Sequence, residues 1–202
     1  MIIIGDSHSV MFEKQGIHCG PRTAYRLYKN KNAFLDLIKH LKNTEEKIGT
    51  IFGEIDCRIH IWYQSKKKKI NVFHLINNTV GFYIEFLNYL RKEGYNIHFI
   101  LEIPPAAEEN NIYKYEYYAD YFNRQLITHH FNRRLEEHAN NNGYFFIKYT
   151  DLVTNSNYCT KREYLMTDGV HLKPIVKPLI MSEIDKIINL EHPNRKVIYG
   201  SK

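Results

Sequence analysis

Ile2-Ile3-Ile4-Gly5-Asp6-Ser7-His8 opens the chain with a short β-branched run that stops at a glycine. Such a run predicts a buried strand, and the polar residues after Gly5 then lie at its carboxyl end. Further along, the apolar residues 48–52 predict another buried strand, which ends at Gly53-Glu54-Ile55-Asp56. Polar side chains therefore follow two separate predicted strands at equivalent positions.

The rest of the chain alternates between strand and helix patterns. Apolar positions recur every three or four residues in the segments expected to be helical. Alternation of this kind predicts a parallel sheet covered by helices on both faces, with its ligand site at the carboxyl ends of the strands. The predicted strands are residues 2–4, 16–19, 48–52, 96–103 and 144–149, and the predicted helices lie within residues 23–41 (after Asn32), 72–90, 113–140 and 175–189.

Length and composition suit one domain. The chain has 202 residues, of which 44% are hydrophobic and 14% aromatic, so it can build a sizeable core. We expect residues 1–190 to form this domain and residues 191–202 to form a polar tail. The net charge of +6 would favour an anionic partner, but such a balance mainly describes association and solubility.

One basic run could be taken for a nucleic-acid contact. Lys66-Lys67-Lys68-Lys69 predicts a solvated loop or the start of a helix rather than a phosphate-binding patch, because like charges repel and prefer water. The aromatic residues lie within apolar periodic runs and show no RNA-binding pattern. We therefore expect no nucleic-acid partner.

Cysteine usage and hydropathy bear on the compartment. Cys19, Cys57 and Cys159 show no C-x-x-C spacing, which argues against a disulfide framework and favours a reducing compartment. The amino terminus lacks the basic and apolar regions of a signal peptide, and no run reaches the roughly 18 apolar residues that span a bilayer. We therefore expect a cytoplasmic protein without a membrane partner.

Three residues from opposite ends of the chain form a candidate catalytic set. A serine hydroxyl becomes a nucleophile when a neutral imidazole takes its proton and a carboxylate fixes the tautomer of that imidazole. Ser7 follows the first predicted strand, and Asp168-Gly169-Val170-His171 places a carboxylate three residues before a histidine. In this interpretation Ser7 attacks, His171 moves the proton and Asp168 orients His171. The alternatives are that Ser7 caps the following helix and that Asp168 caps a turn whose histidine faces solvent.

The order of these motifs resembles that of the SGNH, or GDSL-like, hydrolase superfamily, whose blocks run from Gly-Asp-Ser to a closing Asp-x-x-His. The resemblance covers nearly the whole chain and implies a flavodoxin-like three-layer α/β/α sandwich with a central parallel sheet of about five strands. It also implies an oxyanion hole made by the backbone amides of Ser7 and of a glycine in the second block. Gly20 fits that block best, with an ordinary turn glycine before Pro21 as the alternative.

The chain departs from the superfamily pattern in the third block. An asparagine that donates to the oxyanion is usual there, and this chain has Ile55. Either another donor takes its place or the hydrolytic power is weak. Arginine would supply a permanently charged fork suited to an oxyanion or to an anionic substrate. The candidate substrate-binding residues are Arg22, Asp56, Arg58 and His60.

Two of these candidates have structural alternatives. Arg58 could form a salt bridge with Glu54 or Asp56 instead of meeting the substrate. Asp6 and Asp56 could form an acid/base pair, or they could hold the shape of the site through loop amides and arginines.

Tyrosines crowd the segment that follows Pro104-Pro105. They suit either a sugar-stacking wall beside the site or an ordinary aromatic packing cluster. These residues are Tyr113, Tyr115, Tyr117, Tyr118 and Tyr121.

The residues and the resemblance together predict a serine esterase that acts through an acyl-enzyme on an acyl ester, O-acetyl by first choice, of a carbohydrate. Two alternatives stay open. One is a sugar O-acyltransferase with the same triad, and the other is a glycan or nucleotide-sugar binding module that has lost its chemistry. No cofactor is expected, apart from an acyl donor such as acetyl-CoA for the transferase. No metal is expected, because the potential ligands His8, His18, Cys19 and His60 match no zinc spacing.

Overall fold

The framework of the protein is a parallel sheet of five strands in the order β2-β1-β3-β4-β5. It comes from a computed structural model that describes residues 1–105, 107 and 119–191. The strand order is that of flavodoxin-like folds, in which the ligand lies where the order reverses beside the first strand. The strands are β1 (Ile2–Gly5), β2 (Gly16–His18), β3 (Ile48–Ile51), β4 (Ile97–Leu101) and β5 (Phe145–Ile147).

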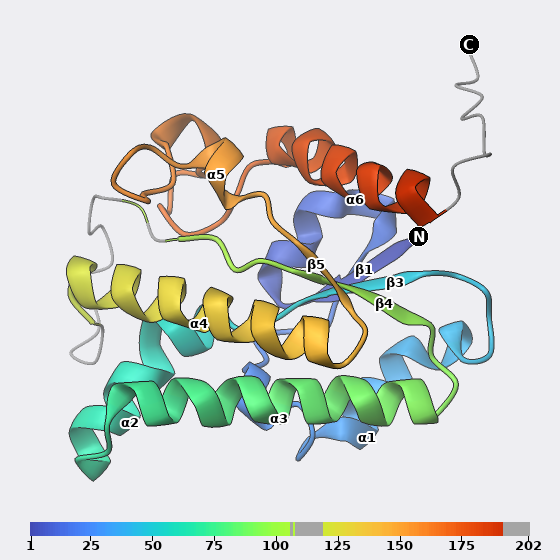
Figure 1. Cartoon of the computed structure of the whole chain (residues 1–202), viewed down its shortest axis with the longest axis horizontal. Coiled ribbons are helices and arrows are strands. Elements are labelled where there is room, and N and C mark those ends of the chain that lie inside the picture. Colours follow the sequence, from blue (N-terminus) through green and yellow to red (C-terminus); the bar gives the residue numbers. More distant parts are fainter. Residues whose placement is uncertain (106, 108–118, 192–202) are drawn as a thin grey trace.

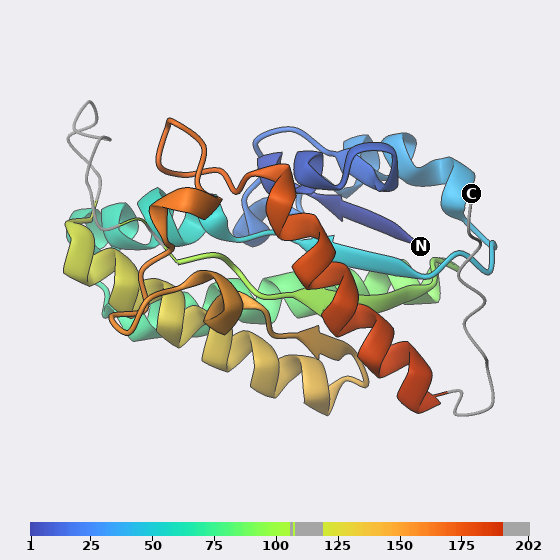
Figure 2. The ribbon, with the colours of Figure 1, turned by 90° about the horizontal axis from the view of Figure 1, so that it is seen from above.

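Helical segments cover both faces of the sheet, so the predicted three-layer sandwich is confirmed. In Figure 1, α6 and the 3-10 segment after β1 lie on one side of the sheet, and α1, α3 and α4 lie on the other. Figure 2 shows α6 crossing over the sheet when the protein is viewed from above. None of the described helices is both long and apolar enough to cross a membrane. The α-helices are α1 (Lys31–Ile38), α2 (Ile61–Lys68), α3 (Val72–Lys92), α4 (Tyr121–Asn141), α5 (Thr150–Val153) and α6 (Lys177–Glu191).

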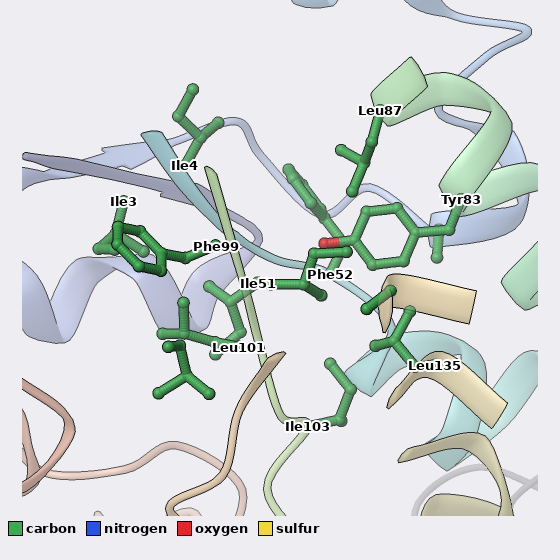
Figure 3. Close-up of a cluster of buried hydrophobic side chains, with 14 of the residues drawn as sticks. Ile3, Ile4, Ile51, Phe52, Tyr83, Leu87, Phe99, Leu101, Ile103 and Leu135 are labelled. Atoms are coloured by element: carbon green, nitrogen blue, oxygen red, sulfur yellow. The ribbon is translucent and has the colours of Figure 1, made fainter. Parts of the chain in front are cut away.

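The central strands are apolar on both sides because both faces are covered. Ile3 and Ile4 of β1 point to opposite faces and are both fully buried. Tyr83 of α3 is buried in the same core, and its hydroxyl donates to Thr50 Oγ1 at 2.8 Å. This bond satisfies two polar groups that would otherwise destabilise the core. Figure 3 shows these side chains packed with residues of β3, β4 and α4.

The two long helices, α3 and α4, begin after residues whose side chains cap them, and a glycine follows the end of α3. Asn71 caps α3 by accepting from the Phe73 amide at 2.8 Å, and Gly94 follows its end with φ +92°. Asp120 caps α4 by accepting from the Asn123 amide at 2.9 Å. The helix expected from residue 113 therefore begins at Tyr121. Of the tyrosine cluster, Tyr113, Tyr115, Tyr117 and Tyr118 lie outside the described residues, as does the predicted tail beyond residue 191.

The lysine run is exposed to solvent, as predicted, but it is neither a loop nor the start of a helix. Lys66, Lys67 and Lys68 form the last turn of α2, and Lys69 ends the helix in the left-handed conformation with φ +55°. Cations are favourable at the carboxyl end of a helix, where the backbone dipole is negative. The ammonium group of Lys66 also lies 4.2 Å from the centre of the Trp62 ring, one helical turn earlier. Helical spacing thus gives the run local partners that a loop would not.

Candidate active site

Ser7 lies directly beyond β1, the strand at which the order of the sheet reverses. It is the first residue of the 3-10 segment Ser7–Gln15, which Asp6 caps by accepting from the His8 amide at 3.0 Å. The interpretation of Ser7 as the cap of this segment is therefore wrong, since Asp6 has that place. The Ser7 hydroxyl is left at the carboxyl edge of the sheet.

The Asp168–His171 turn brings the second and third members of the set to the same edge. Asp168 Oδ1 accepts from the amides of Val170 and His171, at 2.8 and 3.0 Å. Its other oxygen, Oδ2, lies 2.6 Å from His171 Nδ1, and His171 Nε2 lies 2.7 Å from Ser7 Oγ. One oxygen of the Asp168 carboxylate thus caps the turn, and the other orients the His171 ring. Hydrogen bonds join the three residues in one line, across 164 positions of sequence.

The electrostatics of Asp168 suit a residue that stays ionised. Partial burial alone would raise its pKa, but the hydrogen bonds from the His171 ring and from the amides of His171 and Val170 lower the pKa to about 2. A permanent carboxylate beside Nδ1 keeps the proton on that nitrogen, which leaves Nε2 to accept a proton from Ser7.

His8 holds the Asp168–His171 turn in place, a role that was not predicted, since His8 was considered only as a potential metal ligand. Its Nδ1 lies 3.3 Å from Asp6 Oδ1 and its Nε2 lies 3.2 Å from the Val170 carbonyl oxygen. The Val170 carbonyl and an ionised Asp6 carboxylate both accept hydrogen bonds, so this arrangement favours a ring with a proton on each nitrogen. Burial would lower the pKa of His8, but the bond to Asp6 and its charge outweigh burial and raise the pKa. His8 is thus a buried link between Asp6 and Val170, 2% exposed, with its ring 5.3 Å from the ring of His171.

Two backbone amides are candidates for the oxyanion hole. The Ser7 amide is the first of its 3-10 segment and has no acceptor within that segment. Gly20 follows β2, where the Cys19 amide donates to the Gly5 carbonyl at 2.8 Å and joins the two strand ends. Gly20 has φ +79°, and a Cβ placed on it would meet nothing within 4 Å. The backbone conformation therefore requires glycine there, and the space around it is open.

Arg58 does not replace the oxyanion donor that is missing at Ile55. Ile55 is half-buried and lies in the helical turn directly before the π-helical segment Asp56–His60. Arg58 faces Glu54, with Nε 2.5 Å from Oε1 and Nη2 3.1 Å from Oε2. The salt bridge that the sequence offered as the alternative for Arg58 is present, and it occupies the guanidinium fork.

Asp56 holds a loop in place. It is 1% exposed, and its Oδ2 accepts from the Ala24 amide at 2.6 Å. Burial raises its pKa to about 7, although the amides of Ala24 and Tyr25 lower it in part. This geometry favours the shape-holding role over a contact with substrate, and Asp6 has a similar role toward His8.

Arg22 and His60, the other candidates for substrate binding, line one hollow beside Gly20. Arg22 Nε donates to the Cys19 carbonyl at 2.6 Å. His60 is half-buried, and burial, followed by the charges of Arg26 and Arg58, lowers its pKa. Cys19 is no competing nucleophile, because burial raises the pKa of its thiol to about 12. In the described part of the chain, no group of three or more His, Cys, Asp or Glu residues is arranged to hold a metal.

Several solved structures share this fold. A GDSL-like lipase from Bacteroides thetaiotaomicron has 15% identity and a TM-score of 0.65, covering 94% of this chain and 87% of its own. A lipase/acylhydrolase from Enterococcus faecalis has 14% identity and a TM-score of 0.58, covering 97% and 100%. An acetylxylan esterase from Geobacillus stearothermophilus has 12% identity and a TM-score of 0.58, covering 93% and 92%.

No protein-family model and no curated protein sequence matches the chain. At such low identity the structural likeness establishes the fold. The resemblance that the motifs predicted is thus confirmed at the level of the fold, which the chain shares with a GDSL-like lipase, a lipase/acylhydrolase and an acetylxylan esterase.

Proposed function

We propose that this chain, which has the fold of the GDSL-like hydrolases, is a serine esterase that works through an acyl-enzyme. The observation that carries the proposal is the hydrogen-bonded line from Ser7 through His171 to Asp168, with separations of 2.7 and 2.6 Å. This is the arrangement that converts an ordinary serine hydroxyl into a nucleophile.

The reaction follows from the positions of these groups. Ser7 Oγ attacks the ester carbonyl while His171 Nε2 takes its proton, and Asp168 stabilises the resulting imidazolium. His171 then returns the proton to the leaving alcohol, and the acyl group stays on Ser7. A water molecule, activated by His171 in the same way, releases the acid and restores the enzyme.

The amides of Ser7 and Gly20 would stabilise the negative charge that forms on the carbonyl oxygen. One well-placed donor contributes about 3 kcal/mol of transition-state stabilisation. Ile55 supplies no side-chain donor, so two backbone donors would do what three do in the superfamily it resembles. This predicts a slower hydrolysis than three donors would give.

We propose an O-acetyl ester of a carbohydrate as the substrate. The acetylxylan esterase among the structures of the same fold supports this choice, since its name describes an acetylated polysaccharide as its substrate. An acetyl group needs little room beside Ser7, and the hollow beside Gly20 offers space for the alcohol side of the ester.

A second candidate keeps the site and changes the acceptor. In a sugar O-acyltransferase the acyl group passes from Ser7 to a sugar hydroxyl in place of water, with an acyl donor such as acetyl-CoA. The missing donor at Ile55 favours this candidate, because weak hydrolysis protects an acyl-enzyme until the sugar arrives.

The experiment follows cleavage of 4-nitrophenyl acetate with and without a sugar acceptor. An esterase releases nitrophenol and acetate in equal amounts, and a transferase forms acetylated sugar at the expense of acetate. The Ser7→Ala variant should lose both activities, and the control Ser156→Ala, at an exposed loop position, should keep them. If the wild-type protein releases no nitrophenol above the Ser7→Ala background, both candidates are wrong and a binding module remains.

A further inference from the structure

A hollow of about 360 Å³ opens at the carboxyl edge of the sheet, next to Gly20. Its walls come from the loop after β2, from the 3-10 segment Ala24–Arg26 and from the π-helical segment that follows β3. The residues that give it its character are Gly20, Arg22, Arg26, Asn30 and His60.

The hollow is basic, and the described residues that line it include no aspartate or glutamate. Arg22 makes one hydrogen bond within the described ranges, from Nε to the Cys19 carbonyl, and its two terminal nitrogens make none there. Arg26 is exposed, and its side chain makes no hydrogen bond or ion pair to another described residue. Two permanent positive charges therefore share the hollow, and no described residue that lines it supplies a counter-charge.

Arg58, a third arginine nearby, differs from Arg22 and Arg26 because its charge is neutralised by a carboxylate. Arg58, two residues after Asp56, meets Glu54 in a bidentate ion pair and does not line this hollow. The half-buried His60 lies close enough to Arg26 for its positive charge to lower the His60 pKa, after the larger effect of burial. A positive potential of this kind favours an anion over any neutral ligand.

The hollow borders the end of β2, which lies next to the strand end that carries Ser7. The Cys19 amide bonds to the Gly5 carbonyl at 2.8 Å, so the strand ends that carry Gly20 and Ser7 lie side by side. Gly20 belongs both to the wall of the hollow and to the candidate oxyanion hole. A molecule whose ester carbonyl lies at Ser7 would therefore place its remaining part near Arg22 and Arg26.

We propose that this hollow binds an anionic group, a carboxylate or a phosphate, on the molecule whose ester Ser7 attacks. The substrate class is then an O-acylated acidic sugar, either a uronic acid or a sugar phosphate. This assignment rests on the proposed function for the ester, while the anion site itself can be measured without catalysis.

Binding is measured first, by calorimetry on the inactive Ser7→Ala variant at fixed ionic strength. The three probes are glucuronate, glucose 6-phosphate and glucose. We expect at least one of the two anions to bind and glucose to bind at least tenfold more weakly, and the better anion identifies the group that the hollow prefers. Adding Arg26→Gln should weaken anion binding roughly tenfold, the effect of losing a hydrogen bond between charged groups. The control Arg133→Gln removes the same charge from an exposed position of α4 and should leave binding unchanged.

Catalysis is measured with 4-acetoxy-3-nitrobenzoate and its neutral methyl ester, after correction for their uncatalysed hydrolysis. We expect kcat/KM to be about tenfold higher for the anionic ester, and Arg26→Gln to remove most of that preference. Arg133→Gln should keep it.

The proposal is overturned if neither anion binds. It is also overturned if Arg26→Gln and Arg133→Gln lose the same amount of anion affinity, because the effect would then come from the net charge of the protein and not from the hollow. The two proposals fail in different ways. If both esters are cleaved equally well and no anion binds, the anion site is wrong and the esterase stands. If anions bind through Arg26 but neither ester is cleaved, the esterase is wrong and the anion site stands.

Discussion

Buried His8 should stabilise the folded protein, and this prediction can be tested both by the size of the stability loss in a variant and by its dependence on pH. In His8→Phe the aromatic ring fills the space, so the change removes hydrogen bonds and charge without leaving a large cavity. Asp6 loses its ion pair, with side chains only 1% and 0% exposed, and the Val170 carbonyl loses its donor. Breaking a buried pair on one side costs about 3–5 kcal/mol. Asp6 keeps the bond from the residue 8 amide, so we expect the lower end, about 3 kcal/mol.

The effect must depend on pH in one direction. The pKa of His8 is raised in the folded protein, where its ring faces Asp6 directly, with Glu54 adding a smaller effect. A histidine with a raised folded pKa contributes its full stability below the unfolded value of about 6.5 and loses it as pH rises through the folded pKa. The difference in unfolding free energy between wild type and His8→Phe should therefore be largest at about pH 6 and should shrink in more alkaline solution.

Urea unfolding at several pH values measures this difference, with His40→Phe as the control at an exposed position. The control should change stability by less than about 0.5 kcal/mol at every pH. The reasoning is refuted if His8→Phe costs less than about 1 kcal/mol at pH 6, or if its cost grows as the solution becomes alkaline.

Three further predictions concern the site and the sheet. Asp168→Asn should lower kcat for 4-nitrophenyl acetate about 10⁴-fold with its fold intact by circular dichroism, and a loss of less than tenfold would contradict its orienting role. As the pH rises from about 4 to about 7, the wild-type protein should lose stability, because burial raises the Asp56 pKa to about 7 and the folded state then holds a proton that the unfolded state has released. Asp56→Asn should remove that loss in urea titrations at several pH values, and an unchanged profile would contradict the prediction. Gly5→Ala should cost about 1–3 kcal/mol in thermal unfolding, since a Cβ there lies 2.5 Å from the Ile51 carbonyl oxygen. Gly81→Ala, a matched change in α3 with no atom within 4 Å, should instead stabilise by about 0.5–1 kcal/mol, and equal effects would contradict the crowding argument.

Much of the fold was predictable because local pattern and tertiary packing agree. The β-branched run at Ile2–Gly5 is buried on both faces, as the continuous apolar pattern indicates. The end of α3 was readable from Gly94, whose positive φ suits glycine. The helix α2 was missed because its hydrophobic stripe is short and its second half consists of lysines. Its stability depends on neighbours that periodicity does not reveal, including the contact of Lys66 with Trp62.

Some residues of the candidate site could likewise be predicted from the sequence, and others could not. Ser7, Asp168 and His171 were predictable because strand ends in a parallel sheet meet at one edge and because the Asp-x-x-His turn is local. His8 was missed because its partner is the Val170 carbonyl, and a backbone acceptor leaves no mark in the sequence. The short spacing of Asp6-Ser7-His8 was the one available signal. Arg26 was missed because only the loop conformation, held by Asp56, brings it to the same hollow as Arg22.

The central claim is that His171 activates Ser7, and a fluorophosphonate tests it most directly because it reacts with activated serines. Intact-mass measurement after labelling should show one adduct on the wild-type protein, and peptide mapping should place it on Ser7. The Ser7→Ala variant should stay unlabelled and His171→Ala should label far more slowly. A wild-type protein that takes up no label, or a Ser7→Ala variant that takes up as much, would contradict the account.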